Sequence, residues 1–549
     1  IQILTTDEND KNPKQKSNSK NRYSNISYSS SVRLLSDGNN DLFNDASDSD
    51  EYNDMSGVSD MSDMTDYSSS SVKMIEYLEY SSFVTDNVIN MESMFSNCIN
   101  LISLDLIRFD ITNVINMNKM FSNCSSLKKL DLSFFYADNA QEANSMFANC
   151  ISLNSIQFDR FNGKKINDLS FMFYNCTSLN YLNLYSWVIS NVTDMSFMFS
   201  GCTNLTSIKL FKSLSSNLIN MNSMFTDCYS LKSLNFESFE KICIKDAEKM
   251  FFSCTSLKNL NLINFDTSLT TNMGQMFQNC SSLKYLNLFN FVTLNVINFD
   301  SMFMNCTDLI SLDIYTFETP KLKNMNTMFY NCSSLLSLNL TLFNTSLITN
   351  MSHLFANCNK LTELNIDKFI TSEVITMNSM FYNCENLLYL NLESFETNNV
   401  TDMNYMLYNC SNLFDLNFSR HLFDTSEVTS MVSMFEGCRN LIKLELNFFN
   451  TSNVNNMSSM FSNCFELTDL NISIFTTSLV KNMAYMFNNC NNLVSLNLSN
   501  FDVSEVTNME NMFSDCGVLT SLIIKPFSES KVISIKSMFA GCSLLTSID

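Results

Sequence analysis

The sequence predicts an α/β repeat solenoid of the leucine-rich-repeat type, and three observations lead to this fold class. Eighteen of the 19 cysteines recur every 26 residues, apart from one step of 28. Nearly every copy follows the frame M-x-x-M-F-x-x-C-x-x-L-x-x-L-x-L-x-x-F. One copy cannot bury its own apolar face, so only stacked neighbours make a continuous core. We therefore expect about eighteen rungs, each with a parallel strand and a short helical or 3₁₀ segment.

The two halves of the frame predict different local structures. The alternation in L-x-L is typical of a strand with one buried face. The spacings of three and four in M-x-x-M-F-x-x-C favour a turn of helix or 3₁₀. The residue between the two leucines should face outward, and where it is Asn, as in Asn183 and Asn287, we expect stacked amides to bond along the axis. Asn97, which precedes a cysteine and has Gly201 as a counterpart, indicates a left-handed turn.

The recurring cysteines should point inward, each over the cysteine of the next rung. The first interpretation is a small apolar core residue. Disulfides between rungs are an alternative because stacked Cα atoms lie within bridging distance, but stacking in register places the Cβ atoms side by side and favours free thiols. Zinc needs clustered Cys and His, and the only histidines are His353 and His421. The predicted structural ladder consists of Cys98, Cys124, Cys150, Cys176, Cys202, Cys228, Cys254, Cys280, Cys306, Cys332, Cys358, Cys384, Cys410, Cys438, Cys464, Cys490, Cys516 and Cys542.

The chain divides into three predicted regions. Residues 1–70 form an acidic arm rich in Ser, Asn and Asp, a composition that favours disorder. Residues 71–93 match the frame without its cysteine and are expected to be a degenerate capping rung. Residues 94–549 form the solenoid, with no cap expected at the C-terminal end. The single long step in the period predicts a bulge in the loop of residues 418–423.

Composition bounds the possible functions. The formal net charge of −22 argues against nucleic-acid binding and against an anionic membrane surface. No apolar run is long enough for a membrane span. The histidines are isolated and there is no Gly-rich phosphate loop, so we expect no enzyme and no catalytic or metal site. Carboxylates in the acidic arm could bind calcium, although they do not match an EF-hand loop and a solvated acidic stretch is the simpler interpretation; they are Asp45, Asp48, Asp50, Glu51 and Asp54.

The repeated frame, extended to M-F-x-N-C-x-x-L-x-x-L-x-L-x-x-F-x-T-S-x-V, resembles the 26-residue bacterial surface protein repeat of the BspA-like leucine-rich-repeat proteins. The best copies span residues 328–374 and 434–480, and the resemblance covers residues 72–549. It implies an extracellular or cell-surface solenoid that acts in adhesion or surface recognition. It supplies no catalytic residue.

Two functions follow as hypotheses. The first is a surface structural protein that polymerises with itself head to tail into filaments, through the open solenoid end and the N-terminal arm. The alternative is a monomeric adhesin that binds glycans or matrix proteins of a host on its extended face. Tyr181, Tyr285 and Tyr389 should lie on the strand face, but in distant rungs, so no concentrated patch is expected.

Sequons for N-glycosylation are frequent, and their phase in the repeat separates them. One group follows the last Phe of the frame, where the chain should return across the outside, and a second occupies the outward strand position. If the chain is secreted by a eukaryote, we expect glycans mainly on the first group. The first group is Asn191, Asn344, Asn399 and Asn450; the second is Asn339, Asn417, Asn471 and Asn497.

Overall fold

The structure is a computed structural model that describes residues 85–548, except for residues 108, 160, 213–219, 237–241 and 525–530. The predicted acidic arm, its calcium-binding carboxylates and most of the predicted capping rung lie outside the described residues. The described residues all belong to one compact unit, Met74–Asp549.

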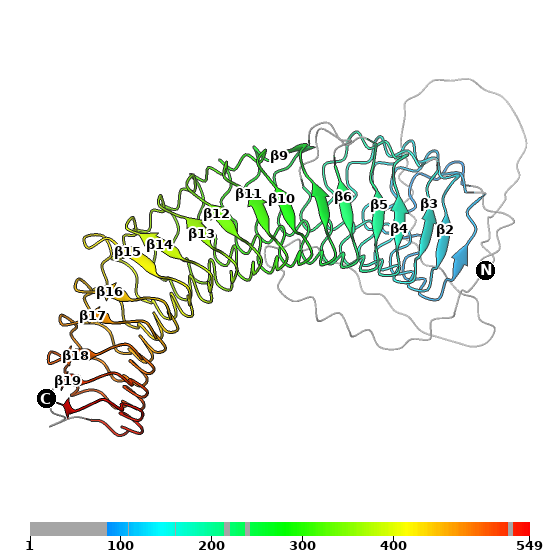
Figure 1. The fold of residues 1–549 in the computed structure, drawn as a ribbon. Coiled ribbons are helices and arrows are strands. Elements are labelled where there is room, and N and C mark those ends of the chain that lie inside the picture. The colour runs from blue at the N-terminus through cyan, green and yellow to red at the C-terminus, as the bar shows by residue number, and fades with distance from the viewer. Residues whose placement is uncertain are drawn as a thin grey trace, which may run out of the picture. The chain divides into compact units, whose positions relative to one another are not determined.

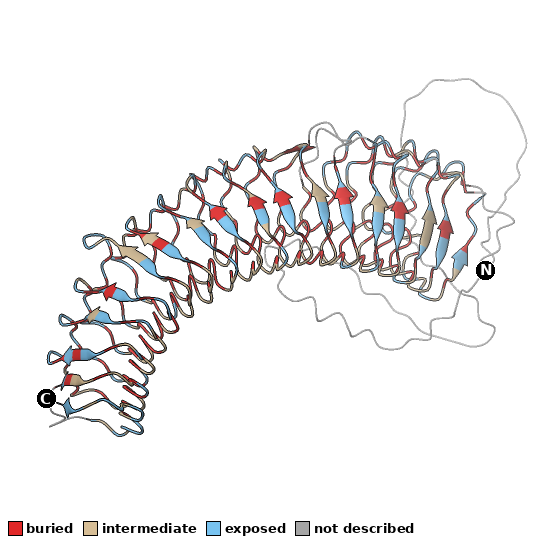
Figure 2. Ribbon diagram, in the orientation of Figure 1, coloured by how far each residue is buried: buried red, intermediate tan, exposed pale blue. Residues whose placement is uncertain are grey.

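The described residues form a parallel β-solenoid of about 16 turns of about 26 residues. Each coil places a strand of two to four residues beside the strand of the next coil (Figure 1). Where strands pair, the register is one repeat, so that Leu286 lies opposite Leu312. In strands such as β4 the middle leucine is buried and its neighbours are exposed, as the L-x-L alternation predicted, and in others, such as β13, the middle leucine is half-buried (Figure 2).

The strands are β1 (Ser103–Leu104), β2 (Lys129–Asp131), β3 (Ser155–Gln157), β4 (Tyr181–Asn183), β5 (Ser207–Lys209), β6 (Ser233–Asn235), β7 (Ile242–Cys243), β8 (Asn259–Asn261), β9 (Phe265–Asp266), β10 (Tyr285–Asn287), β11 (Ser311–Asp313), β12 (Ser337–Asn339), β13 (Glu363–Asn365), β14 (Tyr389–Leu392), β15 (Asp415–Phe418), β16 (Lys443–Glu445), β17 (Asp469–Asn471), β18 (Ser495–Leu498), β19 (Ser521–Ile524) and β20 (Ser547–Ile548). Strands β7 and β9 form a separate parallel pair elsewhere in the coil.

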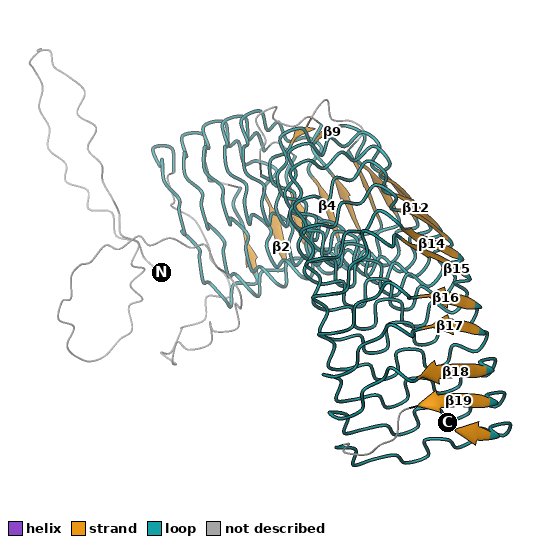
Figure 3. Ribbon diagram, turned by 90° about the vertical axis from the view of Figure 1, so that its left-hand side faces the viewer, coloured by secondary structure: helices purple, strands orange, loops and turns teal. Residues whose placement is uncertain are grey.

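The expected helical or 3₁₀ segment is wrong, because the described residues contain no helix and the strands are joined by turns and loops (Figure 3). The backbone of M-x-x-M-F-x-x-C alternates between two kinds of hydrogen bond. The amide of Met94 bonds within the coil to the carbonyl of Met91 at 3.2 Å, whereas the amide of Phe95 bonds to Met120 in the next coil at 2.8 Å. Two residues per segment, such as Ser93 and Asn97, have φ near +60° (56° and 62°), which ends any helix. Successive tight turns therefore produce the spacing of three and four.

The core lies between the strands and these turns. In nearly every coil the segment contributes Met, Phe and Cys side chains, and away from the first and last coils almost all of them are fully buried. The Phe rings stack from coil to coil; Phe303 and Phe329 have centroids 5.7 Å apart and planes at 11°. Leu407 interrupts this row where Phe is expected. The stack explains why one copy has no core of its own and why the repeat tolerates little change at these positions.

The one long coil accommodates its two extra residues after β15, as predicted. The amide of Phe423 bonds back to the carbonyl of Ser419 at 3.1 Å, and Phe423 returns to the core. Arg420 and His421 are exposed, and Arg420 pairs with Glu445 in the next coil. The insertion is thus a surface bulge that leaves the register of the core intact.

Candidate ligand-binding face

Each coil presents two chemically different surfaces, which we call the turn edge and the strand face. The turn edge is the M-x-x-M-F-x-x-C segment of each coil together with the polar residues just before it. The strand face consists of the exposed residues of each strand, the residue before the strand and the turn after it. A ligand can be bound only by side chains that are exposed and are not already hydrogen-bonded within the solenoid, and the two surfaces differ in how many such side chains they have.

The predicted cysteine ladder lies on the inner side of the turn edge. The thiol of Cys332 donates to the carbonyl of Phe303, in the preceding coil, at 3.1 Å. The ladder thiols from Cys124 to Cys542 repeat this bond, with Leu407 as the acceptor for Cys438. All eighteen ladder cysteines are free, and all but Cys98 and Cys542 are buried. Burial raises the pKa of Cys150 from 9.0 to about 12, so the thiol stays protonated and unreactive near neutral pH.

The asparagine before each cysteine adopts the predicted left-handed turn, with φ of 58° at Asn331 and 75° at its counterpart Gly201. Its amide forms the ladder that was expected on the strands. Nδ2 of Asn331 donates to Oδ1 of Asn305 at 2.9 Å, and Nδ2 of Asn305 donates to Asn279 at 2.8 Å. In the strand position, Oδ1 of Asn287 instead accepts from the amide of Phe289 at 3.1 Å. The strand amides are drawn into this local turn because the backbone bends directly after the strand.

A second left-handed position, four residues earlier, was missed by the sequence analysis. Its occupants include Phe171 and Tyr405, both with φ of 56°. The residues at this position share no chemical type, so the sequence carries no signal for it. A strained conformation at a bulky residue is maintained here because the residue's own amide bonds to the next coil, as that of Phe171 does to the carbonyl of Ser196 at 2.9 Å, and the amide two residues later does the same.

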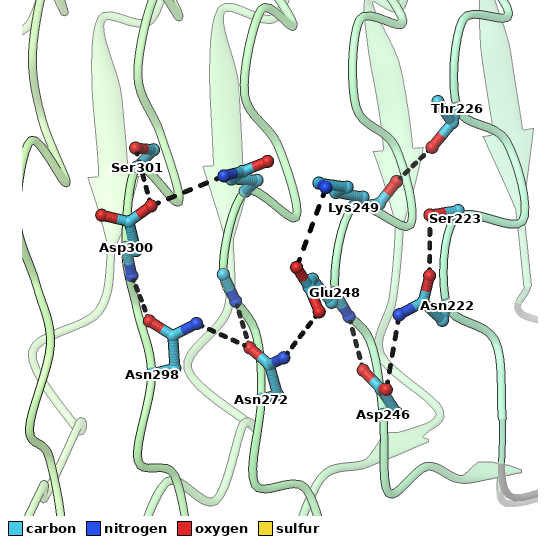
Figure 4. A network of polar contacts seen from close by, with 12 residues as sticks. Asn222, Ser223, Thr226, Asp246, Glu248, Lys249, Asn272, Asn298, Asp300 and Ser301 are labelled. Carbon is cyan, nitrogen blue, oxygen red and sulfur yellow. Dashed lines mark hydrogen bonds and ion pairs between the residues drawn. The ribbon is translucent and has the colours of Figure 1, made fainter. Parts of the chain in front are cut away.

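The outer side of the turn edge is a network of polar side chains that bond to one another (Figure 4). Nδ2 of Asn298 donates to Oδ1 of Asn272 at 3.0 Å, and Nδ2 of Asn272 donates to Oε2 of Glu248 at 2.8 Å. Oδ1 of Asn272 also accepts the amide of Gly274 at 3.0 Å, and Oδ1 of Asn298 accepts the amide of Asp300 at 2.9 Å. The donors and acceptors of this network are therefore hydrogen-bonded within the solenoid, where they link one coil to the next.

The strand face over β6, β8, β10 and β11 differs from the turn edge, because its polar groups are exposed or, like Asn261, half-buried, and only some of them form hydrogen bonds within the described residues. A lysine row precedes the strands of three successive coils: Lys232, Lys258 and Lys284, all exposed. The amide of Lys258 bonds to the carbonyl of Lys232 at 2.9 Å, which fixes the two backbones side by side. An asparagine row follows on the strands; Oδ1 of Asn261 and of Asn287 caps the next turn, and neither Nδ2 has a partner among the described residues.

Large apolar side chains complete this patch. Tyr285 at the start of β10 is 66% exposed. In the turns after the strands, an apolar row of Ile263, Phe289 and Tyr315 is 52%, 47% and 56% exposed. Asn290 links two of these turns by donating from Nδ2 to the carbonyl of Ile263 at 2.9 Å. No patch was expected because only the tyrosines on the strands were compared. Exposed apolar side chains in the turns after the strands, Ile263, Phe289 and Tyr315, form a patch with Tyr285.

Further along the strand face, the position of the lysine row carries mainly apolar side chains. These side chains are exposed, so the face changes from basic to apolar between β10 and β12. They are Leu336, Leu388, Phe414, Ile442 and Val494. Tyr181 and Tyr389 are exposed on their strands as predicted, but each lies four coils from Tyr285.

The predicted glycosylation sites are placed as follows. Asn191, Asn399 and Asn450 are exposed and Asn344 is half-buried, while Nδ2 of Asn399 already donates to the carbonyl of Ser372 at 2.7 Å. In the strand group, Asn339, Asn471 and Asn497 are exposed and Asn417 is half-buried. Glycosylation at any of them stays a prediction.

A hollow of about 450 Å³ lies on the first described coils. Its asparagines are used internally, since Nδ2 of Asn113 donates to the carbonyl of Asp86 and Nδ2 of Asn139 to that of Thr112, both at 2.7 Å. Within the described residues, no cluster of three or more His, Cys, Asp or Glu side chains is placed to hold a metal ion. No segment that the structure describes is a helix with the length and apolar character to cross a bilayer.

Solved structures with a similar fold include three bacterial repeat proteins. A leucine-rich repeat protein of Bacteroides ovatus is 18% identical, with 70% of this chain and 82% of that chain covered and a TM-score of 0.35. A leucine-rich cell surface protein of Faecalibacterium prausnitzii is 14% identical, with 67% and 87% covered and a TM-score of 0.32. An internalin of Listeria monocytogenes is 15% identical, with 59% and 88% covered and a TM-score of 0.22.

No curated protein matches the sequence. A family model described as "Mycoplasma protein of unknown function, DUF285" matches five overlapping segments, residues 39–157, 127–235, 219–338, 335–443 and 430–548. Together the matches run from residue 39 to residue 548 and so span most of the 549 residues. The chain therefore belongs to the DUF285 family.

Proposed function

We propose that the chain is a cell-surface recognition protein that binds a macromolecular ligand on the strand face over β6, β8, β10 and β11. The observation that supports this most is the exposure of Tyr285, Phe289 and Tyr315 beside the lysine row, which is exposed and forms no ion pair with a described residue. Burial of an aromatic side chain is a large gain in free energy, and clustered exposed ones mark interaction sites. A stacked solenoid also offers a wide, rigid face for a ligand.

The surface location is part of the proposal. It is supported by the resemblance of the repeat frame to BspA-like surface proteins. We expect a membrane-impermeant biotin reagent to label the protein on intact cells that produce it, to an extent similar to that in lysed cells. Labelling that requires lysis would contradict a surface location and leave the binding face to be tested separately.

The binding face is tested with the purified full chain and intact animal cells as the ligand source. Tyr285→Ser, Phe289→Ser and Tyr315→Ser together should lower cell binding by about tenfold or more, because each removes an exposed aromatic contact. The matched control is Leu294→Ser, Ile297→Ser and Leu347→Ser, which removes exposed apolar side chains outside the strands. Equal binding by the two variants would contradict a role for the strand face.

Self-association into filaments, through the chain ends, stays a prediction. Electron microscopy of the purified chain, with and without residues 1–70, tests it: filaments that vanish on deletion support the arm's role. Glycosylation is tested by intact-mass analysis of the native protein.

A further inference from the structure

We propose that the patch over β6, β8, β10 and β11 binds a linear acidic polysaccharide, whose carboxylate or sulfate groups lie on the lysine row. This inference rests on the proposed function, because it names the ligand class of the same face. Three neighbouring rows of side chains support it: lysines before the strands, asparagine amides on the strands and apolar side chains in the turns after the strands.

The lysine row is the first part of the argument. The chain has a formal net charge of −22, yet Lys232, Lys258 and Lys284 occupy one position in three successive coils. None of them forms an ion pair with a described residue. Neighbouring parallel strands lie about 4.8 Å apart, so the backbones hold like charges close together at a cost that a bound anion would offset. Asp308 and Asp313, on the coil of β11, bound this basic area on one side.

The asparagine row supplies neutral hydrogen-bond donors at the centre of the patch. Oδ1 of Asn261 and Oδ1 of Asn287 are fixed by the amides of Ile263 and Phe289, at 3.2 and 3.1 Å. Because the oxygens are held, each Nδ2 has a defined direction and is free to donate to a ligand oxygen. Donors repeated at the interval of the coils suit a ligand whose oxygens also repeat along its length.

The apolar row supplies flat or apolar surfaces beside those donors. The turns that carry Phe289 and Tyr315 are linked by a hydrogen bond: the hydroxyl of Thr316, the residue after Tyr315, donates to the backbone carbonyl of Phe289 at 3.0 Å. Sugar rings have an apolar face of C–H groups that packs on aromatic rings, while their hydroxyl and acidic groups point to the sides. A polysaccharide lying along the asparagine row would thus meet aromatic rings on one side and lysines on the other.

The same rows favour a polysaccharide over a nucleic acid. Duplex DNA carries one charge per roughly 1.7 Å of axis, a far denser array than one lysine per coil at about 4.8 Å. An acidic polysaccharide, with one charge on each sugar or each second sugar, comes closer to the spacing of the row.

The test is equilibrium binding of the full chain to polygalacturonate, dextran sulfate, neutral dextran and a thymidine oligonucleotide. We expect binding to polygalacturonate or dextran sulfate that is at least about tenfold tighter than binding to dextran; the two acidic polymers separate carboxylate from sulfate recognition. Lys232→Gln, Lys258→Gln and Lys284→Gln together should weaken it about tenfold or more. The matched control is Lys245→Gln, Lys323→Gln and Lys481→Gln, which removes the same charge from exposed lysines that share a position half a coil away.

Equal weakening by both lysine variants, no binding to either acidic polymer, or tighter binding to the oligonucleotide would each overturn the inference. Circular dichroism at matched temperatures shows that both variants fold. The proposed function fails separately: if the aromatic triple variant binds cells normally, the face is not the binding surface. If that variant loses cell binding while the lysine variant does not, the face binds a ligand of another class.

Discussion

The turn edge and the strand face belong to the same coils but use their side chains differently. On the turn edge, amides bond to amides, thiols bond to carbonyls and Phe rings stack on Phe rings of the next coil. On the strand face over β8 and β10, lysines have no described ion-pair partner and aromatic side chains are exposed. The turn edge stabilises the stack of coils, whereas the strand face has exposed side chains that can contact a ligand. The comparison separates the residues that stabilise this fold from those that we propose bind a ligand.

The largest expected effect concerns the buried thiols. Burial raises the pKa of Cys202, Cys306 and Cys358 from 9.0 to about 12. Above pH 9 the unfolded chain releases these thiol protons and the folded chain does not, so stability is full below pH 9 and is lost as pH rises toward 12. Each thiol costs about 1.4 kcal/mol per pH unit in that window, and urea midpoints at about pH 8 and pH 10 with reductant should differ strongly. Cys306→Ala, Cys332→Ala and Cys358→Ala together should lower the dependence by about 4 kcal/mol per pH unit, because three of the eighteen thiols are removed. A midpoint unaffected by pH would contradict the buried ladder.

The next effect compares one substitution on the two surfaces. Phe329→Ala removes a ring that stacks on both neighbours and should lower the free energy of unfolding by about 3–5 kcal/mol. Phe289→Ala, on the strand face, should change it by less than about 0.5 kcal/mol. Chemical denaturation of the two variants measures the difference. Similar losses would mean that Phe289 is also part of the core.

A smaller effect separates backbone conformation from side-chain bonding in the amide ladder. Asn383 has φ of 57°, donates to Asn357 and accepts from Asn409. Asn383→Ala should cost about 1–3 kcal/mol, because Ala is strained at positive φ and both amide bonds are lost. Asn383→Gly keeps the turn and should cost less. Thermal unfolding of both variants shows the order, and a more stable Ala variant would contradict the left-handed turn.

The smallest expected effect is a change in stability on substitution of a lysine on the strand face. Lys258→Gln should leave stability unchanged or raise it by up to about 0.5 kcal/mol, because it relieves repulsion within the lysine row. Lys323→Gln, outside the row, is the matched control and should have no effect. A clear loss of stability in Lys258→Gln alone would show that this lysine has a structural partner.

Much of the fold was predictable because core positions repeat with few exceptions. The period, the parallel strands, the buried cysteines and the left-handed Asn and Gly all follow from the frame. The turn segment was misassigned because a spacing of three and four fits both a helix and successive tight turns, and the second left-handed position accepts residues as different as Phe171 and Ser93. The exposed patch that we propose as the binding site was missed because Phe289 and Tyr315 lie just after the strands, outside the positions that the frame defines.

Hydroxyl-radical footprinting of the full chain, with and without polygalacturonate or dextran sulfate, tests the contrast most directly. Tyr285 on the strand face and Tyr405 on the turn edge are both exposed, at 66% and 37%, so each reports on its own surface. We predict that the polymer protects Tyr285, Phe289 and Tyr315 from oxidation and leaves Tyr405 unchanged. Protection of Tyr405 without protection of Tyr285 would contradict the account.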